Sequence, residues 1–148
     1  MIKPNGIICE LNCNIDDMSS EQLAYAQGIL LKEGALDVFF TPIYMKKNRP
    51  AYLLSCICKT EDSDKMAELI LKHTTSWGVR KKEYERYTRE KHFEIVPTKY
   101  GDITVKFGIL GDIEKFKVEY EEAADAANRF GIGVGEVINE VIKEYKNK

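Results

Sequence analysis

The sequence contains no long hydrophobic run. Its apolar stretches, such as Val38-Phe39-Phe40, are far shorter than the ~20 residues of a membrane-spanning helix. The first six residues lack the apolar core of a signal peptide. Neither sign of charge dominates, because 22 basic side chains stand against 24 acidic ones, and a net charge of -2 argues against binding nucleic acid over a whole face. We therefore expect a cytoplasmic protein that binds neither membrane nor DNA.

Several well-known ligand-binding and catalytic motifs are also missing. No Gly-x-x-x-x-Gly-Lys-Ser/Thr stretch occurs, which excludes a P-loop. The glycine-rich segment 131–135 lies between two expected helices and does not follow a strand, so it is not a dinucleotide fingerprint. His73 falls on an apolar helical face and His92 has no visible partner, so no nucleophile–histidine pair is indicated. The catalytic residues stay unassigned.

The four cysteines lack the spacing of a zinc site. They stand at positions 9, 13, 56 and 58 without any Cys-x-x-Cys. Ile7, Cys9, Leu11 and Cys13 alternate as residues on one face of a strand do. This pattern favours buried thiols in a reducing cytoplasm. A soft-metal site is the alternative, if the two cysteine-bearing strands lie side by side.

The remaining composition, 44% hydrophobic and 31% charged, is that of a globular protein. Period-two and helical patterns alternate along the first part of the chain, and Ser19-x-x-Gln22 has the form of a capping box. Pro42 favours an edge strand or a bulge. The expected elements are a strand at 6–14, a helix from 19 to 34, strands at 35–46 and 52–58, a helix from 62 or 63, and a strand at 79–87.

This order predicts an α+β protein whose first subdomain, 6–90, is a ferredoxin-like βαββαβ sandwich. A smaller α/β subdomain, 91–148, follows, with a hairpin at 92–107, a short strand within 109–118 and a closing pair of helices. The helical pair could be a DNA-reading helix-turn-helix, but its many carboxylates have the wrong sign for phosphate.

The order of elements also brings three connections to one end of the first sheet. These are the acidic loop 15–18, the basic hairpin 46–49 and the turn 77–80. In this arrangement the third strand is expected on the far side of the first. Asp16 and Asp17 suit a hard divalent cation, or are a solvated acidic pair at a helix start. Lys46, Lys47 and Arg49 suit phosphate, or protect an edge strand.

The segment 80–89 is the third candidate for ligand binding. On a strand, Arg80, Lys82, Tyr84 and Arg86 share one face, and basic groups beside an aromatic ring can stack a base and bind its phosphates. A solvated strand of mixed charge is the alternative. Acids that could hold a metal beside bases that could hold a polyphosphate are the recurring arrangement for metal-bound nucleotides.

Specific strings of the sequence resemble the C-terminal domain of LarC-type nickel-insertion proteins from about residue 6 onward. The matching strings are Asn14-Ile15-Asp16-Asp17-Met18 with Glu21, 34–43, 45–50, Gly78-Val79-Arg80, Glu85-Arg86-Tyr87 with Arg89, Tyr100-Gly101, Val105-Lys106, and Lys117-x-Glu119-Tyr120-Glu121. The sequence departs from the family where Asn12-Cys13 replace Glu-Thr, where Val118 replaces proline, and after Tyr87, where Leu-Pro is missing.

The resemblance implies a nickel chelatase, a CTP-dependent cyclometallase of the lyase class. Such proteins load nickel into pyridinium-3,5-bisthiocarboxylic acid mononucleotide to make the nickel-pincer cofactor of lactate racemase. It further implies CTP bound with Mn or Mg, a homo-oligomer, and an N-terminal domain in cis or on a separate chain. A non-catalytic regulatory or oligomerisation module that binds a small ligand is the alternative function. The expected metal ligands are Asp16 and Asp17, and the expected nucleotide-binding residues are Lys46, Lys47, Arg49 and Arg80, with Arg86, Lys106, Lys117 and Glu119 lining a cleft between the subdomains.

Overall fold

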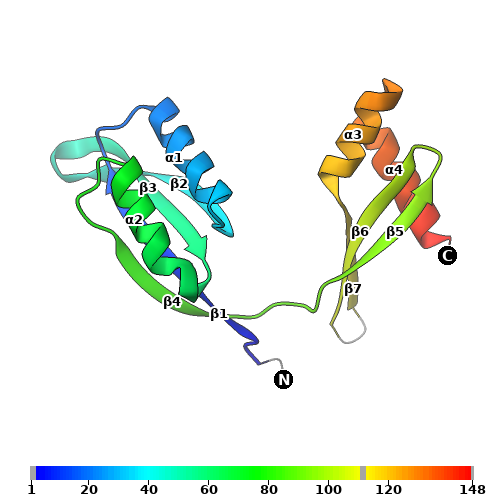
Figure 1. Ribbon diagram of the computed structural model, residues 1–148, viewed down its shortest axis with the longest axis horizontal. Coiled ribbons are helices and arrows are strands. Elements are labelled where there is room, and N and C mark those ends of the chain that lie inside the picture. The colour runs from blue at the N-terminus through cyan, green and yellow to red at the C-terminus, as the bar shows by residue number, and fades with distance from the viewer. Residues whose placement is uncertain (1–2, 111–112, 148) are drawn as a thin grey trace. The chain divides into compact units, whose positions relative to one another are not determined.

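The computed structural model describes residues 3–110 and 113–147. The chain forms two compact units that divide between Thr88 and Arg89, two residues before the boundary expected from the sequence. Each unit has its own antiparallel sheet, its own pair of helices and its own hydrophobic core (Figure 1).

The first unit is the predicted ferredoxin-like sandwich, with its strands in the order β2-β3-β1-β4. The two helices cover one face of this sheet (Figure 1). The expected position of the third strand is wrong, because β3 pairs with both β1 and β2, and β4 takes the far side of β1. The crossover from β1 to β2 leaves a gap of one strand, which the returning β2–β3 hairpin fills. The elements are β1 (Gly6–Ile15), α1 (Ser20–Lys32), β2 (Asp37–Met45), the short 3-10 turn η1 (Lys46–Asn48), β3 (Arg49–Cys58), a second such turn η2 (Thr60–Asp62), α2 (Ser63–His73) and β4 (Arg80–Arg86).

The alternation of β1 places its odd-numbered residues from Cys9 onward in the core, whereas Ile7, on the same face, is 62% exposed near the start of the strand. Cys9, Leu11, Cys13 and Ile15 are all buried against the helices. The capping box of α1 is confirmed, because Ser19 Oγ accepts from the Gln22 backbone and the Gln22 side chain accepts from the Ser19 backbone. Pro42 lies in β2, which is an edge strand as predicted. The cap fixes the start of α1 and thereby the short loop that leads into it from β1.

The second unit confirms the predicted hairpin and helical pair. Its strands run in the order β5-β6-β7, and helices α3 and α4 cover one face (Figure 1). Small and branched residues such as Val105, Ala123 and Val137 fill the space between sheet and helices. The elements are β5 (His92–Thr98), β6 (Gly101–Leu110), β7 (Ile113–Val118), α3 (Tyr120–Phe130) and α4 (Val134–Lys146).

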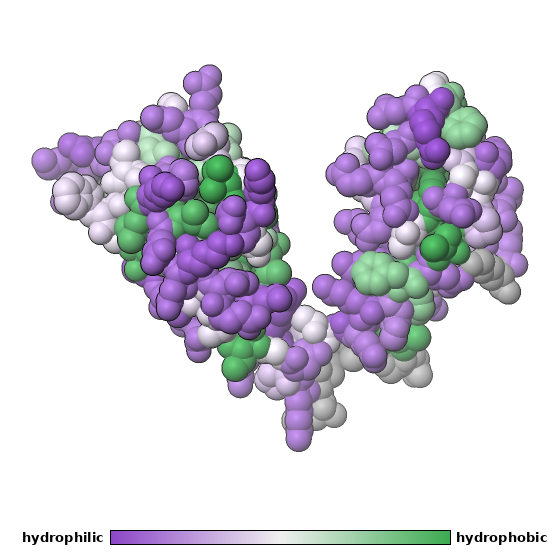
Figure 2. Space-filling model, viewed as in Figure 1, coloured by the Kyte–Doolittle hydropathy of each residue, from purple (hydrophilic) through white to green (hydrophobic). Residues whose placement is uncertain are grey.

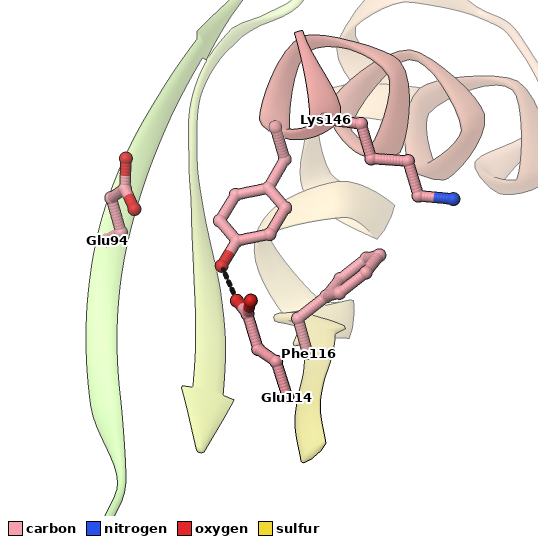
Figure 3. Close-up of a pocket in the computed structure, with 5 residues that line it drawn as sticks. Glu94, Glu114, Phe116 and Lys146 are labelled. Carbon is pink, nitrogen blue, oxygen red and sulfur yellow. Dashed lines mark hydrogen bonds between the residues drawn. The ribbon is translucent and has the colours of Figure 1, made fainter. Parts of the chain in front are cut away.

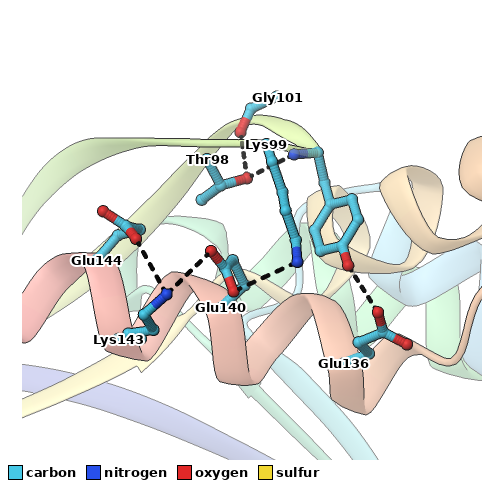
Figure 4. A network of polar contacts seen from close by, with 8 residues as sticks. Thr98, Lys99, Gly101, Glu136, Glu140, Lys143 and Glu144 are labelled. Carbon is cyan, nitrogen blue, oxygen red and sulfur yellow. Dashed lines mark hydrogen bonds and ion pairs between the residues drawn. The ribbon is translucent and has the colours of Figure 1, made fainter.

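Polar contacts tie the β5–β6 turn to α4 (Figure 4). Tyr100 donates its hydroxyl to Glu136 at 2.7 Å, and the Nζ of Lys99 lies 3.7 Å from Glu140. The carboxylate beside the phenol raises the pKa of Tyr100 above its usual value, because it stabilises the protonated form. Gly101 follows with φ 108°, a conformation that side chains rarely adopt, which permits the tight turn.

Within the described residues, no helix is both long and apolar enough to cross a membrane. Hydrophilic side chains cover much of the visible face of each unit, and apolar residues appear there in small patches (Figure 2).

Candidate functional site

The acidic loop and the basic hairpin meet at one end of the first sheet. In the β1–β3 ladder, Ile15 lies opposite Tyr52, so the end of β1 adjoins the start of β3. Arg49, the first residue of β3, donates from Nη1 to Oδ2 of Asp16 at 3.0 Å. The two connections that the order of elements placed together are therefore in direct contact.

Asp17 points to a different neighbour, the loop that leaves α2. Its Oδ1 accepts a short hydrogen bond from the hydroxyl of Thr75, and the Thr75 backbone N–H donates to the sulfur of Met18 at 3.4 Å. The two carboxylates of the loop thus have separate partners. Both partners are polar groups that water or a ligand can replace at this exposed end of the sheet.

Arg80 completes the cationic side of the site. In the β1–β4 ladder it lies opposite Asn12, and its Nη2 donates to Oδ1 of Asn14 at 2.6 Å. The side chain of Ser55 donates to Asn12 at 2.6 Å in the same row. Asn12 and Asn14 therefore link β1 to both neighbouring strands beside the acidic loop.

The hairpin turns through two residues in an unusual backbone conformation. Lys47 has φ 63° and Asn48 has φ 55°, both in the left-handed region, although the turn contains no glycine. Non-glycine residues there cost free energy unless their surroundings hold them, and such positions gather at functional sites. Both Lys46 and Lys47 are exposed, and neither ammonium group is paired with a carboxylate in the described part of the chain.

The chemistry at this end of the sheet fits a cation held together with phosphates. Two carboxylates and the side-chain oxygens of Asn14 and Thr75 are hard ligands of the kind that Mg²⁺ and Mn²⁺ prefer. The described residues contain no group of three His, Cys, Asp or Glu side chains placed to hold a metal ion. A divalent cation here therefore has to take its remaining oxygens from water and from a ligand.

Of the other predicted nucleotide-binding residues, one lies at the opposite end of β4 from Arg80 and three belong to the second unit. Arg86 ends the seven-residue strand that Arg80 begins, which places it about 20 Å along the sheet. Lys106, Lys117 and Glu119 belong to the second unit. Lys106 lies opposite Lys117 across β6 and β7, and the backbone N–H of Glu119 donates to Thr104 at 2.9 Å at the start of α3.

Sequence reasoning missed Thr75 and Asn14. It identified the turn 77–80 but not the hydroxyl-rich residues just before it, Thr74, Thr75 and Ser76. The sequence signal for Thr75 was the run of hydroxyl side chains directly after the second helix, because that helix ends at the same end of the sheet as Asp17. Asn14 lies on the same open face as Arg80, which the alternation of β1 indicates.

The cysteines are buried thiols in the core of the first unit. All four are free, and Cys9 lies opposite Cys58 on neighbouring strands. Burial, with a smaller contribution from the neighbouring thiols, raises the pKa of Cys56 to about 12 and that of Cys58 to about 11. Metals bind the thiolate form, so this environment favours the interpretation as small buried hydrophobes over the soft-metal alternative.

The second unit contains an acidic pocket of about 450 Å³ beside α4 (Figure 3). Glu94, Glu114 and Lys146 line it together with the rings of Phe116 and Tyr145. Tyr145 donates to Glu114 at 2.8 Å. Burial, followed by the hydrogen bond and the charges of the two glutamates, raises the pKa of Tyr145 to about 12.

Comparison with solved structures first defines the fold class. The chain resembles LarC2, the C-terminal domain of a cyclometallase involved in the synthesis of the NPN cofactor of lactate racemase, with a TM-score of 0.88 and 39% identity over 95% of this chain and 97% of that one. A protein from Methanopyrus kandleri shows the same fold with a TM-score of 0.68, at 25% identity over 93% of this chain and 86% of that one. The protein is therefore an α+β domain of the type found at the C-terminus of that cyclometallase.

Comparison of sequences identifies the family. The family model described as nickel insertion protein matches residues 3–138. A pyridinium-3,5-bisthiocarboxylic acid mononucleotide nickel insertion protein from Acetivibrio thermocellus is 42% identical over 92% of this chain and 33% of its own length. One from Lactiplantibacillus plantarum is 44% identical over 82% of this chain and 29% of its own length. The chain belongs to the nickel insertion protein family and spans about a third of the length of these relatives.

Proposed function

We propose that this chain is the nucleotide-binding part of a nickel insertion protein, and that it holds CTP with a divalent cation, Mn²⁺ or Mg²⁺, at the end of its first sheet. The observation that carries the proposal is the 3.0 Å contact between Arg49 and Asp16. It joins an acidic loop to a basic hairpin, and a metal-bound triphosphate needs both kinds of group within reach of each other.

Each group in the proposed site has a distinct role. Asp16 and Asp17 give carboxylate oxygens to the cation, while water and phosphate oxygens complete its coordination. Lys46, Lys47, Arg49 and Arg80 neutralise the phosphates, and the planar fork of an arginine can bind two oxygens at once. A bound cation makes a phosphorus centre more electrophilic.

The wider activity is inferred from the names of the relatives. They are named for inserting nickel into pyridinium-3,5-bisthiocarboxylic acid mononucleotide. We infer that this chain serves the same reaction as part of a CTP-dependent cyclometallase, a nickel chelatase of the lyase class. In this proposal nickel is the cargo, the partner is the N-terminal part of the family in cis or on a separate chain, and the working form is a cytoplasmic homo-oligomer.

Calorimetric titration of CTP into the chain, with Mn²⁺ present, tests the site directly. Asp16→Ala and Lys46→Ala should each weaken binding by about tenfold or more, since each removes a charge-assisted contact. Glu33→Gln is the matched control, because Glu33 forms an exposed ion pair with Lys65 outside the site. Wild-type CTP affinity in both site variants would contradict the assignment.

Mass spectrometry of the nucleotide tests whether the site turns CTP over. The chain is incubated with CTP, Mn²⁺, nickel, the mononucleotide and the N-terminal part of a relative. If the wild-type chain converts CTP and the Asp16→Ala variant does not, the result supports the enzymatic function. Tight binding of CTP with no change in the nucleotide would favour a non-catalytic binding or oligomerisation module instead.

A further inference from the structure

A second basic surface lies in the second unit, on the face of the β5-β6-β7 sheet that the helices leave open. Directly opposed residues of a ladder share a face, and here Lys106 lies opposite Lys117 and Gly108 opposite Lys115. A pocket of about 330 Å³ lies among these residues. Among the described lining residues, it has only Phe116 in common with the acidic pocket beside α4 in Figure 3.

The alternation of the strands shows which way this pocket faces. Phe107 and Phe116, which alternate with these lysines, contact Tyr145 of α4, with ring centroids 6.5 Å and 4.9 Å from its ring. The intervening positions Lys106, Lys115 and Lys117 therefore project from the opposite, uncovered face of the sheet.

Arg89 joins this pocket because its segment packs directly over a glycine. A Cβ placed on Gly108 would meet the carbonyl oxygen of Glu90 at 2.9 Å and the Cβ of Arg89 at 3.3 Å. Only glycine leaves room for the chain to cross the sheet at that distance. The close approach thus brings the Arg89 side chain to the same pocket as the lysines.

The guanidinium of Arg89 has an unused donor. Its Nη1 is buried, and it finds no hydrogen-bond partner within the described residues. A buried donor without an acceptor costs free energy, more so when the group is charged. Because Arg89 lines the pocket, an anion bound there would offer its guanidinium an acceptor and offset that cost.

The charged side chains that line the pocket are all cations in the described part of the chain. Its lining includes the five cations Arg89, Lys91, Lys106, Lys115 and Lys117, and none of the described residues that line it is Asp or Glu. Five like charges repel one another unless an anion lies between them. The absence of a carboxylate in the lining distinguishes this pocket from the Asp16–Asp17 site, because it offers no ligand to a divalent cation.

An exposed aromatic ring lies beside the pocket. Phe93 faces Lys106 across β5 and β6, is 62% exposed, and has the Lys106 ammonium 5.9 Å from its ring centroid. Exposed aromatic rings next to cations stack the bases of nucleotides whose phosphates the cations hold.

We propose that this basic pocket binds the phosphate of an aromatic nucleotide that carries no divalent cation, with the nucleotide's ring against Phe93. The inference rests on the proposed function, which involves two aromatic nucleotides, the pyridinium mononucleotide and CTP. The mononucleotide fits better, because its one phosphate and its thiocarboxylates are anions that lysines and an arginine can neutralise without a metal. CTP without a bound metal also carries phosphates and an aromatic ring, so it is the second ligand that could occupy the pocket.

Titration of the full chain with each ligand separately tests the proposal. The probes are the pyridinium mononucleotide and CTP in a chelator, and CTP with Mn²⁺ reports on the Asp16 site. Arg89→Gln should weaken binding of the metal-free ligand by about tenfold or more. Lys115→Gln, an exposed position that does not threaten the fold, should weaken it by a smaller factor that shrinks as salt rises. Lys143→Gln removes a matched charge from the helical face of the same unit and should have no effect.

The outcomes separate this pocket from the first site. Loss of mononucleotide affinity, or of metal-free CTP affinity, in the Arg89→Gln and Lys115→Gln variants supports the pocket and identifies which source occupies it. Wild-type affinity of both variants for both ligands overturns it. Even if the basic pocket is overturned in this way, the proposed function stands as long as binding of CTP with Mn²⁺ depends on Asp16 and not on Arg89. Failure of the pocket can therefore be told apart from failure of the Asp16 site.

Discussion

Arg49 and Asp16 are 33 positions apart in the sequence, yet Nη1 of the arginine donates to Oδ2 of the aspartate at 3.0 Å. In the free protein each group neutralises the other. If a metal-bound phosphate enters, the carboxylate can turn to the metal and the guanidinium to the phosphate, so binding exchanges one ion pair for two. The Arg49 side chain is 54% exposed, and a pair in that setting contributes at most about 1 kcal/mol to stability.

The planar guanidinium of Arg49 should contribute more to the affinity for the ligand than to the free energy of unfolding. Arg49→Lys keeps the positive charge but loses the bidentate geometry, and we expect it to weaken binding of CTP with Mn²⁺ severalfold, with a larger loss for Arg49→Gln. Both should change the free energy of unfolding by no more than about 1 kcal/mol. Calorimetry and urea denaturation measure the two quantities. Equal CTP affinity of Arg49→Lys and wild type would show that bidentate binding by the Arg49 guanidinium does not contribute.

Ser19 should stabilise the helix that follows the acidic loop. Its hydroxyl accepts from the Gln22 backbone N–H at 3.3 Å, so Ser19→Ala leaves this N–H without its acceptor. We expect a loss of about 1 kcal/mol in the free energy of unfolding, measured by circular dichroism in urea. Ser20→Ala is the matched control, because Ser20 is exposed and makes no side-chain hydrogen bond among the described contacts. A similar loss in both variants would mean that the cap is not the cause.

Much of the first unit could be predicted because its signals are local. The alternation of β1, the Ser19–Gln22 box and Pro42 on an edge strand each follow from a few neighbouring residues. The meeting of Asp16 with Arg49 could also be predicted, since the order of elements decides which strand ends adjoin. The strand order itself was harder, because β1 can pair on either side and only the right-handed crossover with its returning hairpin decides between them.

The partners of individual side chains could not be predicted in the same way. The bond from Thr75 to Asp17 depends on the path of the loop after α2, which has no periodicity. The position of Arg89 depends on its close contact with Gly108, which is distant in the sequence. A glycine inside a strand does not indicate which other segment packs against it. Contacts of this kind arise from packing between segments and not from local pattern.

The buried thiols should make the first unit less stable in alkali. The pKa values of Cys56 and Cys58 rise from 9.0 in a free thiol to about 12 and about 11 in the fold, so the unfolded chain loses these protons first. Their contribution is complete below pH 9 and is lost as pH rises towards 11 and 12. Each thiol should lower the free energy of unfolding by up to about 1.4 kcal/mol per pH unit in that window.

Urea denaturation in reductant between pH 8 and about 10.5 measures this slope, the upper limit lying between the free and folded thiol pKa values. Cys56→Ala should make the slope shallower, whatever it does to the stability at pH 8. Leu23→Ala truncates a buried residue of the same core that lies on α1 and removes no thiol, so it should lower the stability and leave the slope unchanged. An identical slope in Cys56→Ala and wild type would contradict the prediction.

Tyr145 should ionise far later than a free tyrosine, and the reason lies partly in Glu114. Burial is the largest cause of its pKa of about 12, and the hydrogen bond to Glu114 and the charges of Glu114 and Glu94 add to it. Glu114→Gln removes one of those charges, so the pKa of Tyr145 should move down towards 10.0 without reaching it. Nuclear magnetic resonance of tyrosines labelled at Cζ follows this titration residue by residue. Glu144→Gln, a change on the same helix at a carboxylate paired with Lys143, is the control and should leave the titration of Tyr145 where it is. An unchanged Tyr145 pKa in Glu114→Gln would mean that burial alone holds the proton.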